Sequence, residues 1–161
     1  MRTRKFNKKD YNQVVSLFKS MPDNFTKEGI DMLKDNLDLC IKKPKYYKAF
    51  VAIENKKVVG FISYGDTYRR GEVIKLEWIV VSKKYQKIGI ASRLVKKVED
   101  KIKKYNARIF WVDTLDESIK YEPYVAANKF YKKMGFKKEV VLRGFYNSNT
   151  HQAIYVKRYR K

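Results

Sequence analysis

The sequence has little cysteine, few acidic residues and no long apolar run. Cys40 is the only cysteine, so no internal disulfide is possible and the redox compartment stays undecided. No apolar run approaches the roughly 18 residues that a membrane-spanning helix needs, so no membrane association is expected. The basic amino terminus, MRTRKFNKKD, is not followed by an apolar stretch, which is unlike a secretory signal. These shortages favour a soluble, cytoplasmic protein.

The shortage of acid leaves 17 Asp and Glu against 38 Lys and Arg, a formal net charge of +21. Such a charge attracts polyanions over long distances, whether nucleic acid, an anionic membrane or a phosphorylated cofactor. The lysines are spread through every segment, which is typical of a solvated basic surface and also fits a biased genome composition. The charge alone therefore identifies no partner.

Apolar residues are present in sufficient number for a core. Of the 161 residues, 44% are hydrophobic and 15% aromatic, which argues against a disordered chain. The length suits one domain of common size, and no linker or repeat interrupts it. We therefore expect a single domain over residues 1–161.

Hydrophobic spacing and turn residues divide the chain into strands and helices. The first helix is expected to begin at Asn7 with Asp10 and to end before Pro22. The second is expected to begin at Thr26 and to end before Pro44. Two helices are expected between 6 and 47, one from 90 to 105, with Tyr105 on its apolar face, and one from 124 to 134. Strands are expected at 2–6, 47–53, 58–64, 72–81, 107–114, 136–145 and 151–159.

The predicted order is β-α-α-β-β-β-α-β-α-β-β. The central strand–helix–strand unit should form a right-handed crossover and make its two strands parallel, whereas the flanking hairpins should be antiparallel. The fold class is therefore α/β, more fully an α+β mixed sheet. It has about seven mainly antiparallel strands with a central parallel pair, flanked by about four helices. A ligand is expected at the carboxyl end of the central strand.

The stretch LEWIVVSKKYQKIGIASRL, residues 76–94, is the segment that indicates chemistry. It has a strand rich in Val and Ile, then a short basic loop, then the start of an amphipathic helix. The amino terminus of a helix offers unpaired N–H groups and binds phosphate. Gly89 and Ala91 are small enough to let a ligand approach the backbone there.

Two motifs carry a resemblance to a known family. Gln86-x-x-Gly89-x-Ala91, between a strand that contains Glu77 and a helix, is similar to the acetyl-CoA motif of the GNAT superfamily of N-acetyltransferases. Asn128-x-x-Tyr131, on a helix that ends in Gly-Phe, resembles the second block of that family. The resemblance covers residues from about 46 to 159, and Ala91 departs from the glycine that many members have at that position.

The resemblance implies acetyl-CoA as co-substrate and no metal. Backbone amides would bind the pyrophosphate, with Lys83, Lys84 and Lys87 as nearby cations. The pantetheine arm would hydrogen-bond like an added strand where the central strand splays from its parallel neighbour at a bulge. A backbone N–H near Val80 would stabilise an oxyanion. The implied cofactor-binding residues are Ile79, Val80, Val81, Gln86, Lys87, Ile88, Gly89, Ile90, Ala91, Ser92, Asn128 and Tyr131.

The family's reaction needs an acid for the departing thiolate and a base for the attacking amine. Tyr131 matches the usual acid, and its alternative role is aromatic packing. Glu77 matches a position at which many members keep a base, and its alternative is a surface or hairpin-facing carboxylate. Strand alternation places Glu77 on the face of Ile79 and Val81, where partial burial would raise its pKa. Asn128 would bond the pantetheine or order a loop.

The acceptor is harder to predict. A local excess of acid after the fifth strand would attract a cationic amine such as a polyamine, an aminoglycoside or a protein amine, although a solvated acidic loop is the simpler interpretation. Tyr121 and Tyr124 are candidates for the same cleft. His151 is expected to be an ordinary polar residue at the start of the last strand, and Cys40 a small buried hydrophobe. The acidic residues are Asp113, Asp116, Glu117 and Glu122.

The sequence therefore predicts an acetyl-CoA-dependent N-acetyltransferase that moves an acetyl group to a primary amine of a small molecule or peptide. Direct attack and a tetrahedral intermediate would carry the transfer. Two alternatives stay open: a basic nucleic-acid-binding module, which no recognised motif supports, and a catalytically inactive CoA-binding regulatory domain. The chain is expected to be a monomer or a homodimer.

Overall fold

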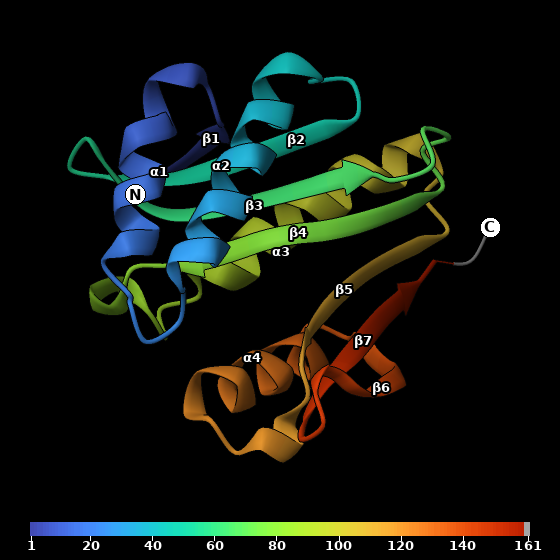
Figure 1. The fold of residues 1–161 in the computed structure, drawn as a ribbon. Helices are drawn as coiled ribbons and strands as arrows, with labels where there is room; N and C mark the ends of the chain where they lie inside the picture. The colour runs from blue at the N-terminus through green and yellow to red at the C-terminus, as the bar shows by residue number, and fades with distance from the viewer. Residues whose placement is uncertain (160–161) are drawn as a thin grey trace.

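Seven strands form one mixed sheet in the order β1-β2-β3-β4-β5-β7-β6 in the computed structural model, which describes residues 1–159. Among these neighbours only β4 and β5 run parallel, as the central crossover predicts. The expected element order and mixed sheet are confirmed, and Figure 1 shows the sheet with helices on both faces. The strands are β1 Arg2–Lys5, β2 Tyr47–Glu54, β3 Lys57–Asp66, β4 Val73–Val81, β5 Ile109–Leu115, β6 Lys137–Asn147 and β7 Thr150–Arg158.

The helices begin where the sequence places their caps. Asn7 and Asp10 form a capping box around a short 3-10 turn, which continues directly into the first helix. The hydroxyl of Thr26 accepts a hydrogen bond from the Gly29 amide at 3.1 Å and starts the second. No helix within residues 1–159 is long and apolar enough to cross a membrane. The helices are α1 Tyr11–Lys19, α2 Lys27–Lys42, α3 Ile90–Ile102 and α4 Glu122–Lys133.

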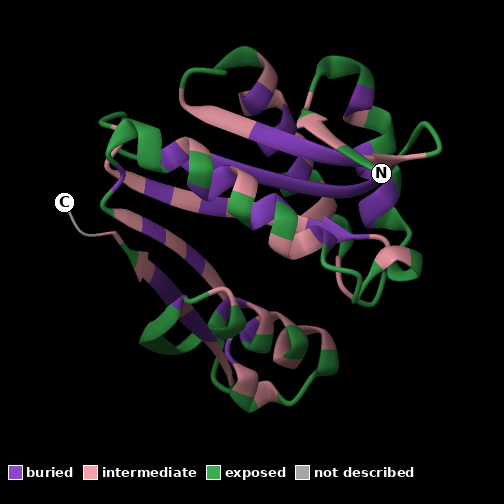
Figure 2. Cartoon of the chain, turned by 180° about the vertical axis from the view of Figure 1, so that it is seen from behind, coloured by how far each residue is buried: buried purple, intermediate pink, exposed green. Residues whose placement is uncertain are grey.

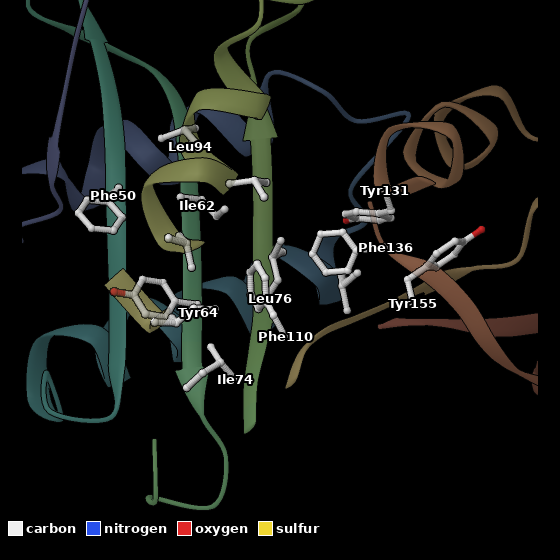
Figure 3. Packing of buried hydrophobic residues seen from close by; sticks show 14 of the residues in the cluster. Phe50, Ile62, Tyr64, Ile74, Leu76, Leu94, Phe110, Tyr131, Phe136 and Tyr155 are labelled. Atoms are coloured by element: carbon white, nitrogen blue, oxygen red, sulfur yellow. The ribbon is translucent and has the colours of Figure 1, made fainter. Parts of the chain in front are cut away.

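Apolar side chains on the two faces of the sheet build two cores. On one face α1 and α2 bury Phe18 and Leu37 against Phe61 of β3. On the other face Leu94 of α3 packs with Ile62, and Figure 3 shows these side chains converging on the sheet. Each fully buried side chain of this size contributes about 1.5–3 kcal/mol, so the two cores fix the helices to the sheet. Figure 2 shows the resulting buried centre of the sheet.

Cys40 and Tyr105 were both expected to be buried, and the structure buries only Cys40. Cys40 is buried in the α1–α2 core, where burial and the nearby Glu77 carboxylate raise the pKa of its thiol to about 12. It therefore acts as a small hydrophobe, as expected. The placement of Tyr105 on the buried face of α3 is wrong. The helix ends at Ile102, and Tyr105 follows in a 3-10 turn with 58% of its surface exposed.

The parallel pair β4–β5 is short, and β4 is irregular just beyond it. Pairing between the two strands is confined to residues 73–75 of β4 and 109–111 of β5. On the other side of β4, Leu76 is opposite Tyr64 and Trp78 is opposite Ser63, so Glu77 is an extra residue without a partner in β3. A β-bulge of this kind bends its strand. The sheet therefore opens between β4 and β5 beyond Lys75, as Figure 1 shows.

Candidate active site

The turn between β4 and α3 presents backbone amides at the open end of the sheet. The side-chain amide of Gln86 donates a hydrogen bond to the Val81 carbonyl at 3.0 Å and so stabilises the turn. Gly89 precedes α3 with φ of 85°, and no side chain caps the helix there. An added Cβ at Gly89 would meet no atom within 4 Å. The first amides of α3 therefore face open space, as an anion-binding helix terminus requires.

Basic side chains surround this turn. Lys84 and Lys87 are exposed, whereas Lys83 forms an ion pair with Asp23 at 3.3 Å. A cavity of about 260 Å³ lies along α3, and some of the residues that line it are cations that the sequence motif did not indicate. Its lining residues are Ser92, Arg93, Lys96, Glu99, Asp100, Lys103 and Met134. The i, i+3 and i, i+7 spacings from Arg93 to Lys96 and from Lys96 to Lys103 place these residues near one helix face and would have indicated them.

The bulge decides where the Glu77 carboxylate lies. Ile79 and Val81 pack in the α3 core, as regular alternation requires. The expectation that Glu77 shares their face is wrong, because the extra residue interrupts the alternation. An added Cβ at Gly65 would lie 3.0 Å from Glu77 Oε1 and 2.8 Å from the ring of Tyr47, which packs in the α1–α2 core. The carboxylate therefore lies on the α1–α2 face of the sheet.

Glu77 belongs to a row of charges at the point where the strands part. Lys75 Nζ lies 2.9 Å from Asp113 Oδ1 and 3.6 Å from Glu77 Oε2. Burial raises the pKa of Glu77, the Lys75 ammonium lowers it, Asp113 raises it further, and the net direction is upward. Gln152 donates to the other Asp113 oxygen at 3.0 Å and to the Tyr146 hydroxyl at 3.3 Å.

Lys75 and Gln152 were not among the residues predicted for the site. Lys75 lies two positions before Glu77, a spacing that does suggest a shared strand face. Its pairing with Asp113 depends on the β4–β5 register, and the contact of Gln152 depends on the β5–β7 register. Neither register can be read from one segment alone.

Tyr131 extends from α4 toward β4, with its hydroxyl at the leading end, as Figure 3 shows. Its ring packs against Phe136 and Tyr155 with centroid distances of 5.9 and 5.8 Å. No residue in the described range 1–159 hydrogen-bonds this hydroxyl. Burial raises the pKa of Tyr131, and the negative charge of Asp113 adds to the rise. The hydroxyl is therefore a protonated donor without a competing partner.

Asn128 is fully buried and fully engaged inside the protein. Its side-chain amide donates to the carbonyls of Leu115 and Tyr124 at 2.9 and 2.7 Å. Its carbonyl oxygen accepts from the Tyr155 hydroxyl at 2.6 Å. Both amide hydrogens are thus used, which favours the loop-ordering role over a contact with pantetheine. This network fixes the start of α4 and with it the helix that carries Tyr131.

The acidic residues after β5 do not form one open patch. Asp113 takes part in the contact with Lys75, whereas Lys138 pairs with Asp116 at 2.9 Å and with Glu117 at 3.0 Å. Glu117 also pairs with Lys132 at 2.7 Å, and Glu122 is exposed at the start of α4. Asp116 is buried and both carboxylates are paired within the protein, so neither an open acidic patch nor a solvated loop describes Asp116.

Aromatic and polar contacts join the loops around the opening. The Tyr121 hydroxyl donates to the backbone carbonyl of Asp23, so the α1–α2 connection reaches the loop that precedes α4. Tyr121 and Tyr124 lie with their rings 5.7 Å apart. His151 Nδ1 accepts from the Gly144 amide at 3.0 Å, as expected for an ordinary polar residue.

Comparisons with known proteins agree with this geometry. The sequence profile of the acetyltransferase (GNAT) family matches residues 12–136. No curated protein matches the chain. A candidate GNAT-family acetyltransferase from Desulfovibrio desulfuricans has a similar structure, with a TM-score of 0.87, 24% identity and 98% of each chain covered.

Two further structures are similar over much of the chain. The aminoglycoside 6′-N-acetyltransferase from Enterococcus faecium has a TM-score of 0.77 at 19% identity, covering 100% of this chain and 99% of that one. A streptothricin acetyltransferase candidate from Bacillus anthracis str. Ames, in complex with acetyl coenzyme A, has a TM-score of 0.65 at 25% identity. It covers 76% of this chain and 68% of that chain. The profile match over most of the sequence establishes that the chain belongs to the GNAT family of N-acetyltransferases, whose acetyl donor is acetyl-CoA.

Proposed function

We propose that the protein transfers an acetyl group from acetyl-CoA to a primary amine of a small molecule or peptide, by direct attack and a tetrahedral intermediate. The observation that carries the proposal is the opening between β4 and β5, with the α3 terminus at one end and the Tyr131 hydroxyl beside it. The β4 backbone at Ile79, Val80 and Val81 has no partner in β5. A peptide-like pantetheine arm fits such an edge.

The phosphates of acetyl-CoA would bind at the other end of the same opening. The amides of residues 86–92 supply hydrogen-bond donors, and the α3 dipole favours negative charge there. Gly89 leaves open space for a phosphate. Arg93 and Lys96, which line the adjoining cavity, add positive charge for a further phosphate.

Glu77 is the proposed base for the attacking amine. An amine that arrives as an ammonium must lose a proton before it attacks the thioester carbonyl. The pKa of Glu77 is raised toward neutral pH relative to an ordinary glutamate, which makes the carboxylate a better proton acceptor. Its position on the α1–α2 face implies that the amine enters from that side. The amine would then give its proton to Glu77 directly or through one water.

Tyr131 is the proposed acid for the departing thiolate. Its hydroxyl keeps its proton because burial raises its pKa, and no described residue competes for that proton. As the tetrahedral intermediate collapses, the carbon–sulfur bond breaks and Tyr131 gives its proton to the sulfur. A backbone N–H near Val80 would stabilise the oxyanion in the preceding step.

Thiol release from acetyl-CoA across a panel of amines tests the proposal. Aminoglycosides and streptothricin come first in the panel, because the names of two similar structures include these compounds. Polyamines, lysine peptides and peptide amino termini follow. Acetyl-CoA at about 100 times its dissociation constant should stabilise the fold by about 2.7 kcal/mol, which a thermal melt detects. A melt that does not move at millimolar acetyl-CoA would contradict the proposal. Stabilisation without turnover on any amine would favour the regulatory alternative.

A further inference from the structure

Three connections at the end of the sheet where β4 begins form a strongly basic surface, named here the basic end. It consists of residues 42–48, 66–72 and 101–108, which lie at the ends of α2, β3 and α3. Ten of these residues are Lys or Arg, and only Asp66 and Glu72 are acidic. Figure 1 shows the three connections at one end of the sheet and the turn between β4 and α3 at the other.

Contacts between side chains and backbone join the three connections into one continuous surface. The Arg69 guanidinium lies 5.0 Å from the centroid of the Tyr46 ring, and Lys48 Nζ lies 5.5 Å from that of Tyr105. An added Cβ at Gly71 would lie 3.5 Å from the Tyr105 carbonyl oxygen. The folded chain therefore gathers cations that are far apart in the sequence.

Most of these cations are not neutralised within the protein. Among residues 1–159, only Lys42 and Arg108 of the ten pair with a carboxylate, at 2.8 and 2.9 Å. Arg108 thereby neutralises Glu72. Asp66 is turned inward, because its Oδ2 accepts from the Gly71 amide at 2.7 Å and its Oδ1 is buried. The remaining positive charge is directed at the solvent, where it attracts polyanions.

Exposed aromatic rings distinguish the basic end from an ordinary solvated lysine surface. Tyr68 has 67% of its surface exposed and Tyr105 has 58%. No ring or cation within residues 1–159 covers the Tyr68 ring. Unpaired bases stack on exposed aromatic rings, while neighbouring cations bind the phosphates. A membrane-binding surface would instead present Leu, Phe or Trp, and the three segments contain none of these residues.

We propose that the basic end binds single-stranded nucleic acid, with cations on the phosphates and bases stacked on Tyr68 and Tyr105. This surface is separate from the turn that presents amides to acetyl-CoA. Val73 and Val81, at the two ends of β4, lie about 25 Å apart at about 3.3 Å per residue. A bound strand would therefore leave the proposed active site open.

Fluorescence anisotropy with labelled single-stranded RNA and DNA of about 20 nucleotides tests the proposal on the intact chain. The affinity should fall as salt rises, with a slope of log affinity against log salt of about −0.7 for each phosphate contact. A duplex of the same sequence should bind more weakly, because its bases cannot stack on the tyrosines. The tighter of the RNA and DNA strands identifies which nucleic acid the surface prefers.

Two variants with the same loss of charge separate the basic end from the general charge of the protein. One variant replaces an unpaired cation of each connection: Lys45→Gln, Arg70→Gln and Lys104→Gln. Its binding should be about tenfold weaker or more, and its salt slope shallower by about 2. The matched control replaces three exposed lysines of β3 and α4, and its affinity should stay within about twofold: Lys57→Gln, Lys129→Gln and Lys133→Gln.

Tyr68→Leu tests the stacking without a change of charge. It should weaken binding of the single strand about fivefold or more and leave the salt slope unchanged. Melting temperatures close to that of the wild type establish that each variant is folded. An affinity equal to that of the wild type, or a duplex bound more tightly than the single strand, would overturn the single-strand assignment.

A wild-type chain that binds neither strand at about 0.05 M salt would overturn the proposal. Equal losses in the two triple variants would mean that dispersed charge carries the binding, which would also overturn it. Binding to vesicles of phosphatidylserine and phosphatidylcholine without binding to either strand would assign the surface to a membrane instead. None of these outcomes depends on acetyl transfer, so the proposal and the proposed activity can fail separately.

Discussion

Two phenylalanine substitutions, one at Tyr131 and one at Tyr155, separate a chemical role from a structural one on neighbouring rings. The ring centroids lie 5.8 Å apart, and each substitution removes one hydroxyl from the same buried cluster. The Tyr131 hydroxyl has no hydrogen-bond partner within residues 1–159. Tyr131→Phe should therefore change the free energy of unfolding by no more than about 0.5 kcal/mol.

The same substitution removes the proposed proton donor. Loss of a general acid lowers kcat about 100-fold or more, equivalent to about 2.7 kcal/mol of activation free energy. The KM for acetyl-CoA should stay within about twofold, because the ring and its packing are retained. Thiol release measures kcat and KM, and urea unfolding measures stability.

Tyr155→Phe should show the reverse pattern. It removes a buried hydrogen bond of 2.6 Å and leaves the Asn128 oxygen without its donor, which should cost about 1–2 kcal/mol of unfolding free energy. Because the Tyr155 hydroxyl is engaged in its bond to Asn128, kcat should fall only a few-fold. Equal kcat for wild type and Tyr131→Phe would refute the acid role. A Tyr131→Phe protein as unstable as Tyr155→Phe would refute the structural basis of the comparison.

Three further substitutions address charge and cofactor binding. Lys75→Met removes the ammonium that lowers the pKa of Glu77, so the acidic limb of the kcat/KM profile should move to higher pH; an unmoved limb would argue against Glu77 as the base. Burial alone would raise the pKa of Asp116, whereas hydrogen bonds from Lys138 and from Ser118 lower that pKa to about 2. Lys138→Met removes one of these two partners and should therefore cost about 1 kcal/mol of unfolding free energy at neutral pH. That difference is fully present above the unfolded pKa of about 4 and should vanish as the pH of urea melts falls toward 2. Gly89→Asn keeps a residue that tolerates positive φ but fills the open space, so titration calorimetry should show about tenfold weaker acetyl-CoA binding with a nearly unchanged melting temperature.

Local rules were sufficient to predict most of the fold. Thr26 begins its helix as a side-chain cap, and the strand–helix–strand crossover gives the parallel pair. Both depend on residues close in sequence or on chain handedness, which a single sequence displays. Tyr105 was misplaced because Asn106 adopts φ of 58° after a 3-10 turn, and that ending competes with a continued apolar spacing.

The positions of the motif residues on their strands and helices were predictable, whereas the directions of their side chains were less so. Gly89 and Tyr131 lie where the resemblance places them, at a helix start and on the helix that faces β4. The face of Glu77 was wrong because a bulge depends on a neighbouring strand that the alternation rule ignores. Lys75 joined the site for a similar reason, since its partner Asp113 comes from a strand about 40 residues later whose register only the folded sheet sets.

The opening between β4 and β5 also has a consequence for cooperativity. Strands β1–β4 and strands β5–β7 form two hydrogen-bonded halves that share backbone bonds only near residues 73–75 and 109–111. The β4 amides that point into the opening should therefore exchange their hydrogens quickly in the free protein, and slowly once a strand-like substrate arm bridges the two halves. Local opening of the catalytic region would then become rarer as the concentration of free acetyl-CoA rises, so the stability of this part of the sheet would depend on how much substrate is present.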